Sequence, residues 1–222
     1  MELVERDADL GAQVEVRLDP RVPVIPLPEP VPPAMTLAEA LLSRRSHYSY
    51  RPLSRQDLSS LLWYAVGVQR RSGPHVLGTN PNAGGLPTIA VHVVQRGSVF
   101  EYLREPHALS LLGGGDLEGV FAQEEFAQEE FARRADTVIV LSGRMGSGPA
   151  KYGPRHYRTA HVDAGVAVQN LYLVATALGL GCCAVAGFSD DAVKALVRAG
   201  EHDVPLVLFV VGQPVSGHNE GA

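Results

Sequence analysis

The sequence predicts an α+β domain of three layers, and three observations support this fold class. Helical and β-branched segments are mixed along the chain in an order typical of α+β or α/β proteins. A length of 222 residues suits one domain or one domain with an arm, and 45% hydrophobic residues can fill a core. The 23 glycines and 16 prolines follow no triplet repeat, so they indicate many turns and not a fibre.

Residues 1–33 are expected to form an arm that precedes a domain of residues 34–222. Seven of the fourteen positions from Pro20 to Pro33 are prolines, which excludes a helix and favours an extended, polyproline-like path. We expect the arm to follow a surface, its own or that of a partner subunit, or to be mobile. The acidic start, Met1 to Asp9, has no apolar stretch behind a basic one and does not resemble a signal peptide.

Two helices are predicted after the arm. The first begins at Thr36, which forms a capping box with Glu39, and extends to about Arg45. The second begins at Ser54 and ends at Gly67. Leucines and one alanine recur at helical spacing in these two segments: Leu37, Leu41 and Leu42 in the first, and Leu58, Leu61, Leu62 and Ala65 in the second.

Strands are predicted where β-branched residues concentrate, at 89–95, 99–103, 137–141, 182–186 and 205–211. An acidic helix is expected over about 116–135. It contains a tandem duplication, Phe121 to Glu125 repeated as Phe126 to Glu130. A period of five does not match 3.6 residues per turn, so the phenylalanines form no single seam. We interpret the repeat as an insertion on a solvated helix.

A long helix is predicted from about His161 to Leu178, and a short one from Ser189 to about Ala199. The long helix is apolar on nearly all sides, so we expect it at the centre of the domain or in a subunit interface. Residues 171–188 carry no charge, but glycines at 179, 181 and 187 interrupt the stretch. A buried helix followed by a buried strand is therefore favoured over a membrane span.

Charge and cysteine content exclude several classes of protein. A net charge of −5 and a pI near 5.9 do not favour nucleic-acid binding. The two cysteines, Cys182 and Cys183, are adjacent, so they form no disulfide framework and have no zinc-ligand spacing. No metal site is expected, the two thiols are interpreted as buried and inert, and a reducing cytoplasm is the expected location.

Several motifs follow one another along the chain: Arg44-Arg45-Ser46 with Tyr50 after them, the turn Pro81 to Leu86, Asp163-Ala164-Gly165 with Gln169 to Leu173, and Ala177 to Phe188. In this order they resemble the nitroreductase-like flavoproteins over residues 36–213. The branch that the chain resembles most is the SagB-type dehydrogenases, because Lys151 and Tyr152 are adjacent and lie shortly before Asp163.

This resemblance implies a central mixed sheet flanked by helices, an FMN cofactor and an intertwined homodimer with two shared flavin sites. It implies oxidation of azoline rings to azoles in a modified peptide, with a cyclodehydratase complex as a further candidate partner. No nucleic acid or membrane partner is expected. Two other functions stay open, a general NAD(P)H-dependent nitro or quinone reductase and a non-catalytic scaffold subunit of a peptide-modifying complex.

The resemblance also assigns cofactor contacts. Two guanidinium groups and a hydroxyl suit a terminal phosphate, and backbone N–H groups at the flavin edge would stabilise the charge that hydride transfer leaves there. Tyr48 stands where the family usually has a basic residue, so Arg70, Arg71 or Arg155 are candidate substitutes. The assigned residues are Arg44, Arg45 and Ser46 for the phosphate, Pro81, Asn82, Ala83 and Gly84 in the turn expected from the partner subunit, Gln169, and Ala184, Val185, Ala186 and Gly187 at the ring.

Lys151 and Tyr152 are the candidate catalytic residues. Oxidation of an azoline removes a hydride and a proton from adjacent carbons, and a lysine of lowered pKa or a tyrosine beside an ammonium group can accept the proton. The alternative is a solvated loop lysine beside a tyrosine that only packs. Four histidines are further candidate acids, each of which is more often a hydrogen-bonded surface residue: His47, His75, His156 and His161.

Overall fold

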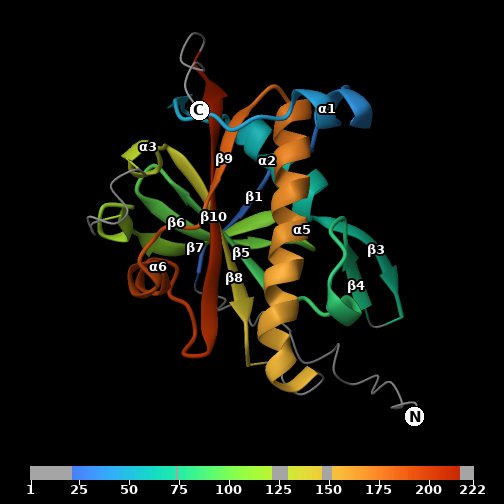
Figure 1. Cartoon of the computed structure of the whole chain (residues 1–222), viewed down its shortest axis with the longest axis vertical. Helices are drawn as coiled ribbons and strands as arrows, with labels where there is room; N and C mark the ends of the chain where they lie inside the picture. Colours follow the sequence, from blue (N-terminus) through green and yellow to red (C-terminus); the bar gives the residue numbers. More distant parts are fainter. Residues whose placement is uncertain (1–21, 74, 122–129, 147–151, 216–222) are drawn as a thin grey trace.

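The computed structural model of the chain describes residues 22–73, 75–121, 130–146 and 152–215. Its centre is an eight-stranded sheet with helices on both faces (Figure 1). The strands follow the order β1 (Val24–Pro26), β7 (Ala108–Gly114), β6 (Ser98–Leu103), β5 (Ile89–Gln95), β8 (Thr137–Arg144), β10 (Asp203–Pro214) and β2 (Tyr50–Arg51), and β9 (Gly181–Val185) also pairs with β10.

Every strand pair within the described ranges is antiparallel, so the expectation of a mixed sheet was wrong in this respect. The strands β8 and β9 do run in the same direction, since both are antiparallel to β10. However, Leu208 to Val210 of β10 pair with both strands, so β10 lies between them and they form no parallel pair. The three-layer α+β architecture is confirmed.

Two clusters of buried apolar side chains occupy opposite faces of the sheet. Successive side chains of a strand point to opposite faces, so Val93 of β5 belongs to one cluster and Val94 to the other. The first cluster includes α2 (Arg55–Val66) and α5 (His156–Ala177), and the second includes α6 (Asp190–Leu196), the 3-10 turn Gly119–Phe121 and Ala132 of α3 (Glu130–Arg133). Figure 1 shows these helices in two separate layers.

The first two predicted helices are confirmed with their caps. In α1 (Leu37–Ser43) both hydrogen bonds of the Thr36–Glu39 capping box are present. In α2 the Ser54 hydroxyl accepts the Asp57 N–H at 3.0 Å, and Gly67 is the C-cap. The predicted apolar residues of α2 are fully buried, whereas Leu37, Leu41 and Leu42 of α1 are exposed, Leu42 at 90%.

The helix α5 begins five residues earlier than predicted. The 3-10 turn Gly153–Arg155 leads directly into it at His156. It is also less buried than expected, because Val162, Gly165 and Gln169 form an exposed stripe at intervals of three and four residues. Ala160, Ala167 and Leu171 face the first core cluster.

Part of the proline-rich segment lies along its own chain. Residues 24–26 form β1 and pair with β7 at the edge of the sheet, and the Leu27 N–H donates to the His107 carbonyl at 3.0 Å. The Ser59 hydroxyl of α2 donates to the Pro28 carbonyl at 2.5 Å, and the Val31 N–H donates to the Ser60 hydroxyl at 2.9 Å. The boundary between arm and domain stays a prediction.

The expected strands at 89–95, 99–103, 137–141, 182–186 and 205–211 are confirmed as β5, β6, β8, β9 and β10, and the ends of all but β5 are shifted. The hairpin of β3 (Val68–Ser72) and β4 (His75–Gly78) was not predicted. The acidic helix is shorter than expected at its described ends, where Val120, Phe121 and Ala132 are buried against the sheet and not solvated. Most of the duplication, residues 122–129, lies outside the described residues.

Close backbone approach fixes one corner of the sheet. A Cβ atom on Gly212 of β10 would lie 2.5 Å from the Arg51 carbonyl oxygen, so glycine is required where β2 meets β10. None of the helices in the described ranges is long and apolar enough to cross a membrane.

Candidate functional site

The predicted phosphate-binding residues follow the end of α1 directly. Because α1 ends at Ser43, the guanidinium groups of Arg44 and Arg45 extend from the chain just after the helix, and both residues are exposed. The Arg44 guanidinium carbon lies 5.1 Å from the centre of the Tyr172 ring. The Ser46 hydroxyl lies 3.4 Å from the Tyr172 hydroxyl. Arg44 and Ser46 therefore meet on one tyrosine of α5.

Tyr172 also contacts the strand that carries the predicted ring-binding segment. The Ala184 N–H donates to the Tyr172 hydroxyl at 2.8 Å. This N–H, predicted to face the flavin, is thus engaged within the chain. Val185 is buried, Ala186 is exposed and Gly187 is half-buried, so the accessible part of the predicted segment begins where β9 ends.

The segment after Ser46 is joined to β9 by two hydrogen bonds. The His47 N–H donates to the Cys182 carbonyl at 2.9 Å, and the Cys182 N–H donates to His47 Nδ1 at 3.4 Å. Burial, with a smaller effect from Arg45, lowers the pKa of His47. Burial also raises the pKa of Cys182 to about 12, and both cysteines are buried thiols, in agreement with inert thiols.

The predicted turn at 81–85 packs against the other half of α5. The Ala83 N–H donates to both carboxylate oxygens of Asp163, at 3.0 and 3.1 Å. Gly84 adopts a positive φ of 63°, which favours glycine, while Pro81 is exposed and Asn82 is half-buried. Burial raises the pKa of Asp163, and the hydrogen bonds from Ala83 and Thr88 partly oppose this shift.

Of the two candidate catalytic residues, the structure describes Tyr152, and Lys151 lies outside the described residues. Tyr152 is half-buried and its ring stacks on His156, with 6.5 Å between ring centres and 10° between planes. The Nε2 atom of the buried His156 lies 3.3 Å from the Arg144 carbonyl. His161 pairs through Nδ1 with the Tyr157 carbonyl at 2.8 Å. These two histidines are both engaged with backbone carbonyls.

The predicted site residues form two groups within one chain. One group surrounds Tyr172 in the C-terminal half of α5, and the other surrounds Asp163 in the N-terminal half. Tyr172 follows Asp163 by nine positions in the helix, which corresponds to about 14 Å along the axis. Figure 1 shows α1 beside the C-terminal end of α5, while β4, which leads to the turn, lies lower along the helix. The exposed Gln169 lies between the two groups, one turn before Tyr172.

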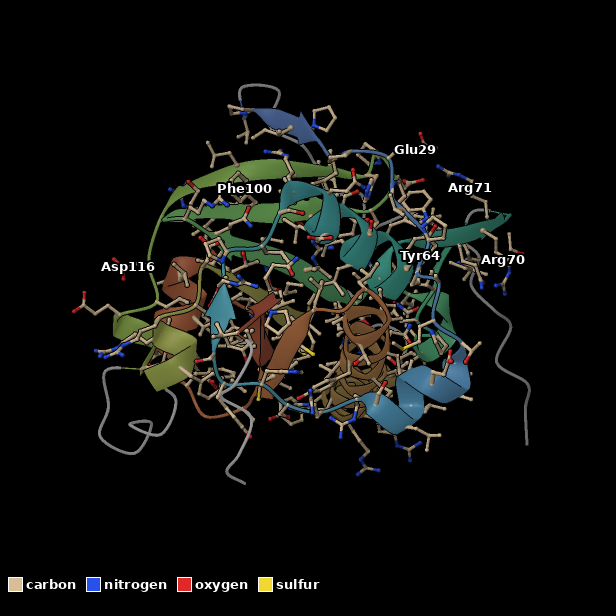
Figure 2. All side chains as sticks on the ribbon, turned by 90° about the horizontal axis from the view of Figure 1, so that it is seen from above. Glu29, Tyr64, Arg70, Arg71, Phe100 and Asp116 are labelled. Carbon is tan, nitrogen blue, oxygen red and sulfur yellow. The ribbon has the colours of Figure 1, made fainter. Side chains whose placement is uncertain are left out.

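The candidate substitutes for a missing basic residue lie elsewhere. Arg70 and Arg71 project from the outer part of the β3–β4 hairpin (Figure 2). Arg71 forms an ion pair with Glu105, and Arg70 donates to the Gln69 side chain. Arg155 is exposed at the N-terminal end of α5. The structure therefore places none of the three in the group around Tyr172.

Sequence reasoning missed the connecting roles of Tyr172 and Asp163. Both residues belong to the quoted motifs, yet their partners come from segments distant in sequence. The available signal was a hydroxyl and a carboxylate beside apolar residues of the helix, since buried polar groups require partners.

The comparisons with known proteins identify the family of the chain. A family model described as "Nitroreductase family" matches residues 41–213. The chain is 30% identical over 188 residues to MJ1384 of Methanocaldococcus jannaschii, which carries a nitroreductase name. That alignment covers 81% of this chain and 91% of the relative.

Solved structures share the fold over most of the chain. A protein of Ralstonia eutropha JMP134, also named as a nitroreductase, has a TM-score of 0.75 and 26% identity over 87% of this chain and 90% of its own. A chain of the E. coli microcin synthetase McbBCD complex, solved with truncated pro-MccB17 bound, has a TM-score of 0.63 and 19% identity. That match covers 97% of this chain and 84% of the other, and it shows likeness of fold.

Proposed function

The chain belongs to the nitroreductase family of oxidoreductases, and from this premise we propose that it is an FMN-dependent dehydrogenase that oxidises azoline rings in a peptide. One observation supports the cofactor assignment: Arg44, Ser46 and β9 all contact Tyr172. This donor set fits the group, because guanidinium and hydroxyl donors suit the phosphate of FMN and the end of β9 offers backbone near the ring.

The bound flavin would supply a hydride acceptor. The residues of the chain would hold its phosphate at Arg44, Arg45 and Ser46, and accept a proton at Lys151 or Tyr152. Conversion of an azoline to an azole removes two hydrogens and one electron pair. One carbon loses a hydride and its neighbour loses a proton, and dioxygen or another external oxidant finally receives the electron pair.

Two observations favour the peptide substrate. The adjacent Lys151 and Tyr152 lie just before α5, and Tyr152 stacks on His156 in the first turn of that helix. A chain of the E. coli microcin synthetase McbBCD complex, solved with truncated pro-MccB17 bound, has the same fold. A cyclodehydratase complex is the corresponding candidate partner for this chain.

We propose that the active form is a homodimer in which each flavin site takes one group of residues from each chain. Within one chain the Tyr172 group and the Asp163 group lie about 14 Å apart along α5. A twofold axis beside α5 would place the Asp163 group of one chain near the partner subunit's Tyr172 group. Exposed apolar residues on this side support such an interface, namely Leu37, Leu41, Leu42 and Val162.

The second candidate function is reduction of nitro or quinone compounds by NAD(P)H. The nitroreductase names of the M. jannaschii and R. eutropha relatives favour it. Such a reduction needs no base that takes a proton from carbon. The two functions therefore differ in their dependence on Lys151.

The first experiment is the absorption spectrum of the purified protein, with the released chromophore identified. We expect FMN at close to one per chain. Turnover of a synthetic azoline peptide is then compared with NAD(P)H-dependent reduction of a nitroarene and a quinone, for the wild type and for Lys151→Ala and Tyr152→Phe. The proposal predicts azoline oxidation that Lys151→Ala abolishes.

Each other outcome has a definite meaning. Reductase activity that survives Lys151→Ala, with no azoline oxidation, would establish the second candidate. A colourless protein that cannot be reconstituted with FMN would contradict both enzymes and leave a scaffold subunit of a peptide-modifying complex. Arg198→Ala is a suitable control, because Arg198 follows α6 and contacts β7 on the opposite side of the sheet.

A further inference from the structure

Tyr172 contacts two stretches of the candidate flavin site that are far apart in sequence. Its hydroxyl lies 2.8 Å from the Ala184 nitrogen and 3.4 Å from the Ser46 oxygen. Its ring lies beneath the Arg44 guanidinium, 5.1 Å from ring centre to guanidinium carbon. One side chain thus touches two of the three predicted phosphate-binding residues and the strand β9.

The Tyr172 ring is held from more than one side. Phe209 of β10 packs edge-on against it, with 5.1 Å between centres and 87° between planes. Arg44 covers part of one face, in the geometry of a cation–π interaction. A ring constrained in this way keeps its hydroxyl in one place without any bound ligand.

One of the two hydrogen bonds at the Tyr172 hydroxyl has a fixed direction. A backbone N–H is only a donor, so the Tyr172 oxygen accepts from Ala184, while either oxygen can be the donor between Tyr172 and Ser46. When Tyr172 donates, the Ser46 oxygen accepts, and the Ser46 hydrogen can point to another acceptor. Burial raises the pKa of Tyr172, so the phenol retains its hydrogen at neutral pH.

We propose that Tyr172 is a positioning residue for the phosphate of the bound flavin nucleotide, because it orients the Ser46 hydroxyl as a donor and supports the Arg44 guanidinium. This inference rests on the proposed function, since it assumes that Arg44 and Ser46 bind phosphate. Tyr172 acts through these two residues and forms no bond to the phosphate itself. Its effect is therefore specific to flavins that carry a phosphate.

The test compares FMN with riboflavin, which lacks the phosphate. Apoprotein of the wild type and of Tyr172→Phe is titrated with each flavin, and the quenching of flavin fluorescence gives Kd. The variant keeps the ring, and with it the contacts to Phe209 and Arg44. We expect Kd for FMN to rise about two- to tenfold, the range of one hydrogen bond, and Kd for riboflavin to change less than about twofold.

Tyr102→Phe is the matched control. It also removes one buried tyrosine hydroxyl, which bonds to Nδ1 of His107 at 2.8 Å, and His107 is not a candidate site residue. We expect this control to leave the FMN-to-riboflavin ratio of affinities unchanged. A general loss of stability would weaken both flavins equally and would not imitate the expected result.

Ser46→Ala and the double variant Ser46→Ala/Tyr172→Phe complete the test. If Tyr172 acts through Ser46, the FMN-to-riboflavin ratio of affinities falls in Ser46→Ala. Adding Tyr172→Phe then lowers this ratio little further. Should Tyr172→Phe fail to fold, an unchanged ratio in Ser46→Ala would still overturn the proposal. Wild type that binds no flavin would overturn both this inference and the proposed function. Wild type that prefers FMN, with an equal preference in Tyr172→Phe, would overturn this inference alone.

Discussion

Asp163, in the middle of the first half of α5, receives the backbone N–H of Ala83 on both of its carboxylate oxygens, at 3.0 and 3.1 Å. The turn that carries Ala83 is thereby fastened to the helix that also carries Tyr172. The carboxylate is 4% exposed, and this burial raises its pKa above the usual value of 3.8. The charge of the carboxyl group that holds the turn through Ala83 consequently depends on pH.

The first prediction follows from that raised pKa. The folded state favours the protonated carboxyl, so the contribution of Asp163 to stability is complete below about pH 3.8 and is lost as the pH rises through the raised value. Asp163→Asn keeps an oxygen acceptor for the Ala83 N–H and does not titrate. We expect its stability relative to wild type to increase from pH 4 to pH 7, measured by urea unfolding at both values.

Asp163→Ala is the control for the hydrogen bond. It leaves the Ala83 N–H without its acceptor, so we expect it to be about 1–3 kcal/mol less stable than Asp163→Asn at both pH values. Equal stability of the two variants would show that the bond between Asp163 and Ala83 does not hold the turn.

The second prediction concerns acid sensitivity at His92 of β5. Its side chain is 7% exposed, and burial, aided by Arg144, lowers its pKa to about 4. The unfolded chain binds a proton near pH 6.5 while the folded chain does not, so stability falls as the pH decreases from 6.5 to 4. The expected slope is about 1.4 kcal/mol per pH unit inside this window.

His92→Leu should remove that slope. Among the described residues, His92 Nδ1 has no hydrogen-bond partner, so replacing His92 by an apolar side chain of similar size removes no hydrogen bond at this atom. Free energies of unfolding at pH 4.5, 5.5 and 7 measure the effect. An identical slope in wild type and variant would mean that another group takes up the proton.

The third prediction concerns the proposed dimer. Leu42 of α1 is 90% exposed in the single chain, beside two further exposed leucines, and large apolar patches of this kind mark contact surfaces. We expect Leu42→Arg to convert a dimer into a monomer in sedimentation experiments. Because each site would lose the partner subunit's residues, the monomer should also release its FMN.

Val24→Arg serves as the comparison. Val24 is 43% exposed on β1, at the opposite edge of the sheet order from β2. This variant should remain dimeric and keep its flavin. A dimeric, flavin-loaded Leu42→Arg protein would place the interface on a different surface.

The sequence predicted elements best where local signals agreed with the final packing. The helices begin and end as expected at their caps: α1 begins after Thr36, and α2 begins after Ser54 and ends at Gly67. The antiparallel sheet was not predicted, because the position of β10 between β8 and β9 depends on pairing across the whole chain. The strand β7 was missed since Gly113 and Gly114 are weak strand formers.

The candidate site was predictable in its parts and not in its connections. The run from Arg44 to Ser46 and the turn near Ala83 carry local motifs. Tyr172 contacts Ser46 and Asp163 binds Ala83, and both contacts depend on how α5 is positioned against these two segments. The hydrogen bond from the Ala184 N–H to the Tyr172 hydroxyl also depends on the position of α5, because the sequence of a strand does not show which side chain lies next to its edge.

The strand β10 has a further consequence for the order of folding. It pairs with β8 and β9, and at its end Gln213 faces Arg51 from the opposite end of the sequence. Pairings between such distant segments form slowly, because the chain between them must first lose its conformational freedom. The hairpins of β5, β6 and β7 can form early, whereas the surroundings of Tyr172 require β9 and therefore β10. Competence to bind a cofactor should then appear in the last phase of refolding.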